Sequence, residues 1–267
     1  MGMMPIYFIL ALDVVTATIA ITPLFFFHIP QPNRTLIEPT TPRTVIKDVV
    51  EGLRYVKAWP GMLLLLGCAA LINFLFTPVD SLMPLLVTKH FNGDAIQLGL
   101  LSSTFGVGAV IGGLVLSVWG GFKRKIYTTM LGLVGMGLGV IVMGAAPSSL
   151  FYMALAGAVV CGFMGPIVNG PIFAIVQSNV DPSVQGRVMA LISTFCMAMM
   201  PIGTMIAGPV SDLLGIRVWY FIAGGGILLM GLSGFVIPSL RKLEDHKTEV
   251  AAVSADVQPA AIETPAD

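Results

Sequence analysis

The chain has 267 residues, of which 56% are hydrophobic and only 10% are charged, and its mean hydropathy is +0.91. A soluble domain of this size could not hide so much apolar surface in one core, so the composition excludes a soluble globular protein. The formal net charge is zero, but in a membrane protein the placement of charges matters more than their sum. We therefore expect a lipid bilayer as the surroundings of the chain and no nucleic acid as partner.

Long apolar stretches dominate the chain from end to end. Each is close to the ~20 residues that a helix needs to cross ~30 Å of hydrocarbon. The seven stretches cover residues 5–27, 61–87, 96–119, 126–146, 150–176, 188–210 and 218–237. The sequence therefore predicts an all-α integral membrane protein with seven transmembrane helices.

Lysine and arginine fall almost wholly in alternate gaps between these stretches. Twelve of the fourteen lie in one set of gaps, and the other set holds only Lys89 and Arg217. By the positive-inside rule the first set is cytoplasmic, which predicts a cell-membrane protein with its N-terminus outside and its C-terminus inside. Aromatic residues typical of interfacial belts also fall at predicted span ends: Trp59, Trp119 and Tyr127 at inner ends, and Tyr7, Tyr152, Trp219 and Tyr220 at outer ends.

The segments outside the spans differ in composition. After the first span (1–27), a cytoplasmic connector (28–60) begins with a proline-rich stretch, and Thr41 and Pro42 then supply a helix start. Apolar residues from Val45 to Val56 recur at helical spacing, which predicts an amphipathic surface helix. A six-helix bundle (61–240) follows, and the polar tail (241–267) is expected to be disordered and cytoplasmic.

A short pattern occurs twice, three spans apart and on opposite sides of the membrane. It joins two glycines, a polar residue and a following basic residue. The copies close two of the spans: Gly113, Ser117, Gly120 and Lys123 at the end of the third stretch, and Gly208, Asp212, Gly215 and Arg217 at the end of the sixth. Inverted placement is typical of two three-helix units related by a pseudo-two-fold axis in the membrane plane. A chance match in a chain with 30 glycines is the alternative.

Prolines interrupt two spans at corresponding places in the predicted repeats. Pro78 and Pro84 lie in the second stretch, and Pro166 and Pro171 lie in the fifth. Interrupted spans in corresponding positions are the best sequence indication of flexible, gating helices around a binding site.

Two carboxylates, Asp13 and Asp80, lie well inside predicted spans. An acid at the bilayer centre costs about 2.5 to 3.5 kcal/mol on insertion scales, so each needs a partner or a task. We take both as proton-coupling candidates. The alternatives are a structural, hydrogen-bonded carboxyl for Asp13 and an interfacial acid at a helix end for Asp80.

Candidates for a substrate cavity come from amides and soft apolar side chains at membrane depth. They are Asn73 and Asn169 beside the prolines, and Phe195, Met197, Met199 and Met200 in the sixth span. Methionines repack easily around varied ligands. The alternatives are amides that bond backbone carbonyls freed by proline, and a stripe of Met and Phe that only packs against other helices.

Four segments resemble the drug-proton antiporter group of the major facilitator superfamily, which includes macrolide efflux proteins. They are Lys47 to Val56 with Trp59, Pro60 and Gly61; Leu12 to Val14; Trp119 to Lys125; and Gln185, Gly186, Arg187 and Val188 with Pro201 to Gly203, Gly208 and Pro209. The resemblance implies that residues 1–27 contain helix six of a twelve-helix transporter and that helices seven to twelve follow. Ser117 stands where the loop motif often has Asp, and Arg187 belongs to the resembling segments. Because the N-terminal half of the family pattern is missing, the chain looks like a fragment or a truncated reading frame.

The sequence carries no nucleotide-binding loop, zinc pattern or nucleophile elbow, so we expect neither an enzyme nor a bound cofactor or metal. Three hypotheses remain: the C-terminal half of a proton-driven efflux transporter for amphipathic small molecules, a half-size transporter that acts as a homodimer, and a non-transporting membrane scaffold or sensor. The first needs the missing N-terminal half as its partner, and the second needs another copy of the chain.

Overall fold

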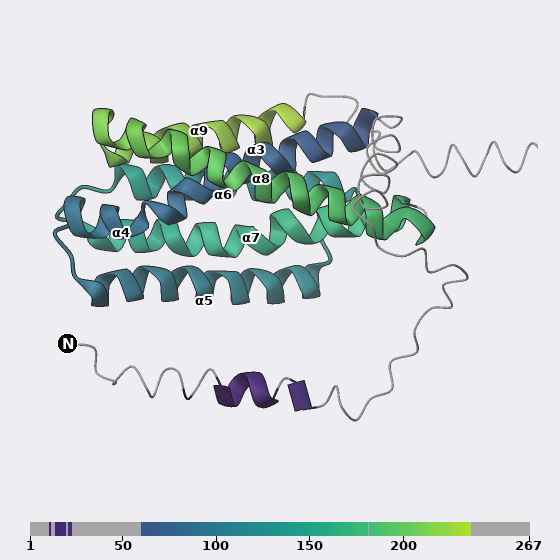
Figure 1. Cartoon of the computed structure of the whole chain (residues 1–267), viewed down its shortest axis with the longest axis horizontal. Helices are drawn as coiled ribbons and strands as arrows, with labels where there is room; N and C mark the ends of the chain where they lie inside the picture. Colours follow the sequence, from purple (N-terminus) through teal and green to yellow (C-terminus); the bar gives the residue numbers. More distant parts are fainter. Residues whose placement is uncertain (1–10, 12–13, 20, 23–59, 181, 236–267) are drawn as a thin grey trace, which may run out of the picture. The chain divides into compact units, whose positions relative to one another are not determined.

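The computed structural model describes residues 11, 14–19, 21–22, 60–180 and 182–235 (Figure 1). The chain divides into two compact units, Met1–Val45 and Ile46–Asp267. The described residues of the first unit are helical. Asp13, the connector with its amphipathic helix, and the polar tail all lie outside the described residues, so their predicted structure stays a prediction.

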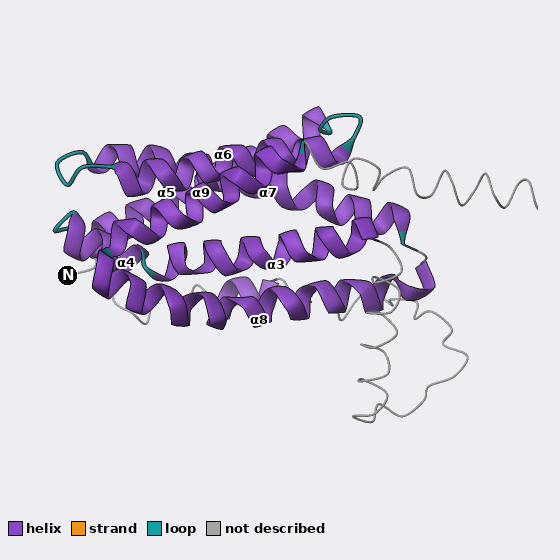
Figure 2. Cartoon of the chain, turned by 90° about the horizontal axis from the view of Figure 1, so that it is seen from above, coloured by secondary structure: helices purple, strands orange, loops and turns teal. Residues whose placement is uncertain are grey.

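The second unit is built from helices, and none of its described residues belongs to a strand (Figure 2). In chain order they are α3 (Pro60–Ser81), α4 (Met83–Leu85), the π-helix η1 (Leu86–His90), α5 (Ala95–Trp119), α6 (Lys125–Ala145), α7 (Phe151–Asn179), α8 (Pro182–Leu214) and α9 (Ile216–Gly234).

Among the described residues, six helical segments are long and apolar enough to cross a membrane, and α3, α4 and η1 together form the first of these, Gly61–His90. This confirms the predicted all-α membrane fold and six of its seven spans. The span at residues 5–27 is not among the six. The largest shift of a boundary is in α8, which includes Arg187 and continues to Leu214. Hydropathy underestimates the length of such a helix because its polar ends can extend beyond the lipid into water.

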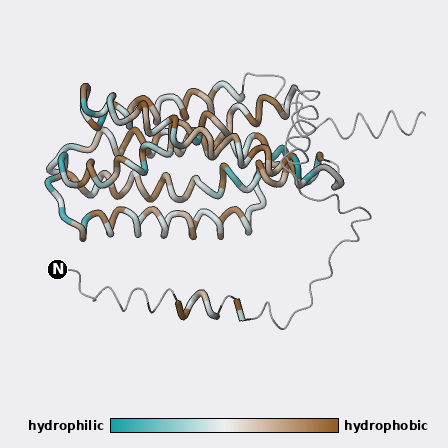
Figure 3. Tube along the Cα trace, viewed as in Figure 1, coloured by the Kyte–Doolittle hydropathy of each residue, from teal (hydrophilic) through white to brown (hydrophobic). Residues whose placement is uncertain are grey.

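Hydrophobic residues run along the helices of this unit and are not confined to its core (Figure 3). Val118 in α5 and Met205 in α8 are 91% and 75% exposed, and Leu232 in α9 is also exposed. A helix that is apolar on its outer side as well as its inner side requires an apolar surrounding, which a lipid bilayer provides.

The six spans form two triplets, α3–α5–α6 and α7–α8–α9, whose neighbours correspond. Helix α7 packs against α5 and α6 of the other triplet (Figures 1 and 2). In the same way, α3 packs against α8 and α9. The third helices of the two triplets, α6 and α9, pack against each other. Because successive spans alternate in direction, α3 and α7 run in opposite directions. The contacts therefore confirm the predicted 3+3 inverted repeat.

The contact between α6 and α9 is itself symmetric. Gly137 and Gly224 face each other, and a Cβ atom built on either would lie 2.7 to 2.8 Å from a backbone carbonyl oxygen of the other helix. Gly144 and Gly231 each lie seven residues further along their helices and again meet the opposite helix. Small residues let two helix backbones approach closely. In lipid the hydrophobic effect does not drive helices together, so such close packing is what makes them associate.

Each copy of the glycine pattern ends its helix at a glycine with positive φ, but ψ is −4° at Gly120 and 149° at Gly215. Gly120 ends α5 with φ 72°, and Gly215 ends α8 with φ 94°. The amide of Gly120 donates to the carbonyl of Leu116 at 2.8 Å, and that of Gly215 donates to the carbonyl of Ser211 at 3.0 Å. A residue with positive φ after a helix is usually glycine because a Cβ would be strained there.

Candidate functional site

The first helix of each triplet contains a proline that lies next to a glycine of the other triplet. Pro78 removes an N–H group and so leaves the carbonyl of Phe74 without its helical partner. Gly203 of α8 approaches this carbonyl so closely that it leaves no room for a Cβ. On the other side of the bundle, Pro166 of α7 packs beside Gly113 of α5. At Pro78 the freed carbonyl is thus covered by the backbone of a neighbouring helix, whereas Gly113 makes only an ordinary contact with the ring of Pro166.

Beyond Pro78 the path of the first span is irregular. Helix α3 ends at Ser81, Pro84 occupies the short α4, and η1 follows with π-helical bonding in which the amide of Phe91 donates to the carbonyl of Leu86 at 3.2 Å. Single π-helical turns are frequent at functional sites. Pro171 in α7 is buried and lies inside a continuous helix.

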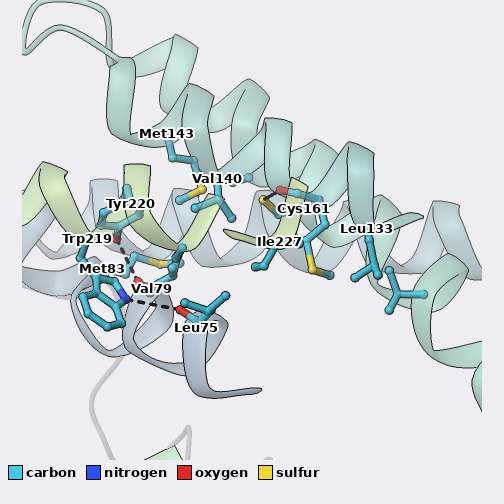
Figure 4. Packing of buried hydrophobic residues seen from close by; sticks show 14 of the residues in the cluster. Leu75, Val79, Met83, Leu133, Val140, Met143, Cys161, Trp219, Tyr220 and Ile227 are labelled. Atoms are coloured by element: carbon cyan, nitrogen blue, oxygen red, sulfur yellow. Dashed lines mark hydrogen bonds between the residues drawn. The ribbon is translucent and has the colours of Figure 1, made fainter. Parts of the chain in front are cut away.

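Two aromatic side chains of α9 hold α3 on either side of Pro78 (Figure 4). The indole Nε1 of Trp219 donates to the carbonyl of Leu75 at 3.3 Å, and the hydroxyl of Tyr220 donates to the carbonyl of Val79 at 2.9 Å. Both side chains are buried, so they face the interior of the bundle and not the lipid, which differs from the outward-facing aromatic residues of an interfacial belt. Their polar atoms find partners inside the bundle.

A weaker counterpart joins α6 to α7. The hydroxyl of Thr129 donates to the carbonyl of Val168 at 3.4 Å, between Pro166 and Pro171. In both triplets, therefore, the third helix of one donates a side-chain hydrogen bond to the interrupted helix of the other.

Of the two carboxylates, only Asp80 is described. Its side chain is exposed and it stands one residue before the end of α3. The helical path continues to His90, which places ~15 Å of helix between this acid and the end of the span at 1.5 Å per residue. Its predicted role in proton coupling stays a prediction, as does that of Asp13.

The two amides bond within their own helices. Nδ2 of Asn73 donates to the carbonyl of Ala69 at 2.9 Å, and Nδ2 of Asn169 donates to the carbonyl of Gly165 at 3.0 Å. The carbonyls freed by proline are others, namely those of Phe74, Gly162 and Ile167. Asn169 is exposed and Asn73 is half-buried, and α3 and α7 are not among the closely packed pairs, so the structure does not bring the amides together.

The four predicted apolar cavity residues lie on two sides of α8. Phe195 and Met199 are four residues apart and share the side next to the packed face, whereas Met197 and Met200 are three apart and share another side. Met197 is the most exposed of them, at 69%. Their role as cavity residues stays a prediction.

The charged and polar positions of the two loop patterns have different surroundings. The hydroxyl of Ser117 donates to the carbonyl of Gly113 at 2.8 Å, so it bonds within α5. Nε and Nη2 of Arg217 donate to the carbonyls of Gly144 and Ala145, at 2.6 and 3.2 Å. The remaining positions are exposed or adjoin open space: Lys123, Arg187, Gly208 and Asp212.

Comparison with known proteins assigns this arrangement to a family. The sequence model described as Major Facilitator Superfamily matches residues 5–204 and 62–263. The chain belongs to the Major Facilitator Superfamily. Membership of this superfamily agrees with the six apolar helices and indicates a multi-pass membrane protein.

Relatives within the superfamily include efflux proteins. The chain is 27% identical over 236 residues to Macrolide efflux protein A of Streptococcus pyogenes, which covers 88% of the chain and 58% of the relative. For Macrolide efflux protein A of Enterococcus faecalis the identity is 28% over 195 residues, covering 73% and 60%. For the Multidrug efflux pump Tap of Mycolicibacterium fortuitum it is 26% over 204 residues, covering 75% and 48%. The chain spans about half the length of these curated relatives.

Sequence reasoning did not find the hydrogen bonds that Trp219 and Tyr220 make to α3. Donor and acceptor are 144 and 141 residues apart, and the acceptors are backbone carbonyls, which leave no pattern of residue types. The only available signal was the pair of aromatic residues next to Arg217, and their position at a span end favoured the belt interpretation.

Proposed function

We propose that the chain is the C-terminal half of a secondary active transporter that exports drug-like, amphipathic small molecules. The observation that carries this proposal is the similarity to Macrolide efflux protein A over 88% of the chain. Similarity to a multidrug efflux pump over 75% of the chain supports the same substrate class. The proline-interrupted helices α3 and α7 are the parts expected to move during transport.

The proposed transporter needs a second six-helix unit. Helices α5 and α8 are the least buried of the six spans, and large apolar side chains such as Val110, Leu114 and Met205 are exposed on them. We propose that a matching N-terminal half covers part of this surface and completes the substrate path. A second copy of the chain is the alternative partner, and the length of the relatives favours the first.

Proton antiport is the proposed source of energy, with Asp13 and Asp80 as candidate coupling acids. In the proposed orientation the N-terminus lies outside and the C-terminus lies in the cytoplasm. Asp80 supports this role because it is an exposed carboxylate within a predicted membrane-spanning helix, beside the interruption at Pro78. A charge there is costly unless it has a partner or a task.

Efflux by reconstituted halves tests the proposal. Cells that lack their own macrolide pumps would express the chain alone, a matching N-terminal half alone, or both, and retention of a radiolabelled macrolide would be measured with and without a protonophore. We expect protonophore-sensitive efflux only with both halves. Efflux by the chain alone, with a dimeric mass in detergent, would support the second-copy alternative, and no efflux in any combination would contradict the proposal.

The same assay tests the coupling acids. Asp13→Asn cannot titrate but is nearly isosteric, so in the complete transporter it should abolish transport driven by a pH gradient and leave equilibrium macrolide binding nearly unchanged. Asp80→Asn should reduce transport less. Normal transport by Asp13→Asn would place the coupling acid elsewhere.

A further inference from the structure

A pocket of about 520 Å³ opens at one end of the bundle, where η1 and α8 end and α9 begins. One wall is basic and consists of Lys89, His90 and Arg217. The rest of the lining, called the apolar wall below, includes Leu214, Val218 and Phe221. Because these residues lie at the ends of predicted membrane spans, the pocket lies at the boundary between water and lipid.

The basic wall is fixed in place by the end of α6. Arg217 donates to the carbonyls of Gly144 and Ala145, and Nε2 of His90 lies 2.9 Å from the carbonyl oxygen of Ala146. The partial negative charge at a helix C-terminus is about half an elementary charge, so it does not neutralise two full positive charges. Among the described residues that line the pocket, none carries a carboxylate. The wall therefore keeps a net positive charge.

The start of α9 adds donors to the same space. Its N-cap is Gly215, which offers no side-chain cap. The amide of Val218 donates to the carbonyl of Gly215 at 3.1 Å, and the amides of Ile216 and Arg217 have no acceptor within the helix. A Cβ built on Gly215 would meet no atom within 4 Å, so this side of the pocket is open. The positive charges of the wall and the amides of α9 favour an anion at the same place.

We propose that this pocket binds a phosphate group. The charges of Lys89 and Arg217 attract it, and the rest of the ligand packs against the apolar wall. Basic pockets at the membrane boundary suit the head groups of anionic lipids. The phosphate can belong to a phosphatidylglycerol molecule of the bilayer or to inorganic phosphate in the water. The lipid would also pack against the apolar wall, whereas inorganic phosphate has no apolar part to do so.

Photo-crosslinking in nanodiscs tests the site without measuring transport, so its result does not depend on the proposed function. The full chain would be placed in equimolar phosphatidylcholine and phosphatidylglycerol, with a trace of phosphatidylglycerol that carries a diazirine in its head group. We expect the lipid probe to crosslink to residues in the segment from Leu214 to Phe221. Lys89→Gln should reduce their yield roughly fivefold, because one basic residue near a membrane surface contributes about that factor. Lys123→Gln, an exposed lysine at the opposite end of the spans, is the matched control and should leave these crosslinks unchanged.

The second arm uses inorganic phosphate against chloride at equal ionic strength. Crosslinks that phosphate does not displace identify the lipid as the source. Crosslinks that phosphate displaces, with a rise in melting temperature that Lys89→Gln abolishes, identify free phosphate. The proposal is overturned if neither crosslinks nor stabilisation occur, or if Lys89→Gln crosslinks as well as the unchanged chain. Lys89 is exposed, and equal melting temperatures without phosphate would verify that its replacement leaves the fold intact.

Discussion

Single hydrogen bonds decide how α3 is held next to its interruption. Tyr220 is fully buried, and its hydroxyl is the side-chain donor to the carbonyl of Val79. In a membrane bundle such a bond contributes less than the isolated bond strength, because the unfolded chain in lipid also finds partners. A buried carbonyl that loses its donor nevertheless has no water to replace it. The position of α3 around Pro78 therefore depends on α9.

Removing this hydroxyl should weaken the bundle measurably. We expect Tyr220→Phe to lower the free energy of unfolding by about 1 kcal/mol, measured by titrating the purified chain in dodecyl maltoside with sodium dodecyl sulfate. Tyr152→Phe is the matched control, because Tyr152 is 82% exposed and its replacement should change the free energy little. Equal effects of the two changes would show that the bond to Val79 does not stabilise the fold.

At the scale of helices, close packing of backbones explains the arrangement better than the amount of apolar surface does. The helices are apolar on both their inner and outer sides, so burial in lipid and burial against another helix differ little in hydrophobic free energy. Gly137 and Gly224 select the α6–α9 contact by shape, and Gly112 and Gly162 do the same for α5 and α7. Glycine at these positions is needed for space, and its conformation is ordinary helix.

Neighbouring glycines of α9 provide a test with opposite expected signs. A Cβ on Gly224 would lie 2.8 Å from the carbonyl oxygen of Gly137, whereas one on Gly225 would meet nothing within 4 Å. Gly224→Ala should destabilise the chain, since overpacking typically costs roughly 1 to 3 kcal/mol. Gly225→Ala should stabilise it by about 0.5 to 1 kcal/mol, because alanine is the better helix residue. The same detergent titration measures both, and destabilisation of equal size would argue against the α6–α9 contact.

For the whole molecule, the unequal distribution of lysine and arginine predicts the orientation in the membrane. Two exposed loop positions at opposite ends of the bundle suit a labelling experiment: Ser148 between α6 and α7, and Phe122 between α5 and α6. The side chains of both residues are exposed, and the loop of Phe122 is held by a hydrogen bond from its amide to the hydroxyl oxygen of Thr128 at 2.8 Å.

Single cysteines at these positions, in a chain whose own three cysteines are replaced, should react differently in intact cells. We expect an impermeant maleimide to label Ser148→Cys and not Phe122→Cys, and to label both after the cells are opened. Labelling of position 122 in intact cells would reverse the predicted orientation.

The sequence by itself predicted the fold class, six spans with ends close to those observed, the superfamily and the repeated glycine pattern. These features depend on hydropathy over about 20 residues and on local turn geometry, which a single segment carries on its own. Gly120 and Gly215 both have a positive φ after a helix, which local turn chemistry predicts, although their ψ angles are −4° and 149°.

Only the tertiary structure decided which helices touch, that Trp219 and Tyr220 turn inward to α3, and that Lys89, His90 and Arg217 line one pocket. Those contacts join segments far apart in the chain, and many of them end on backbone carbonyls or on glycine. Neither group has a side chain whose type could reveal its partner, so the match between two surfaces exists only once the helices are packed.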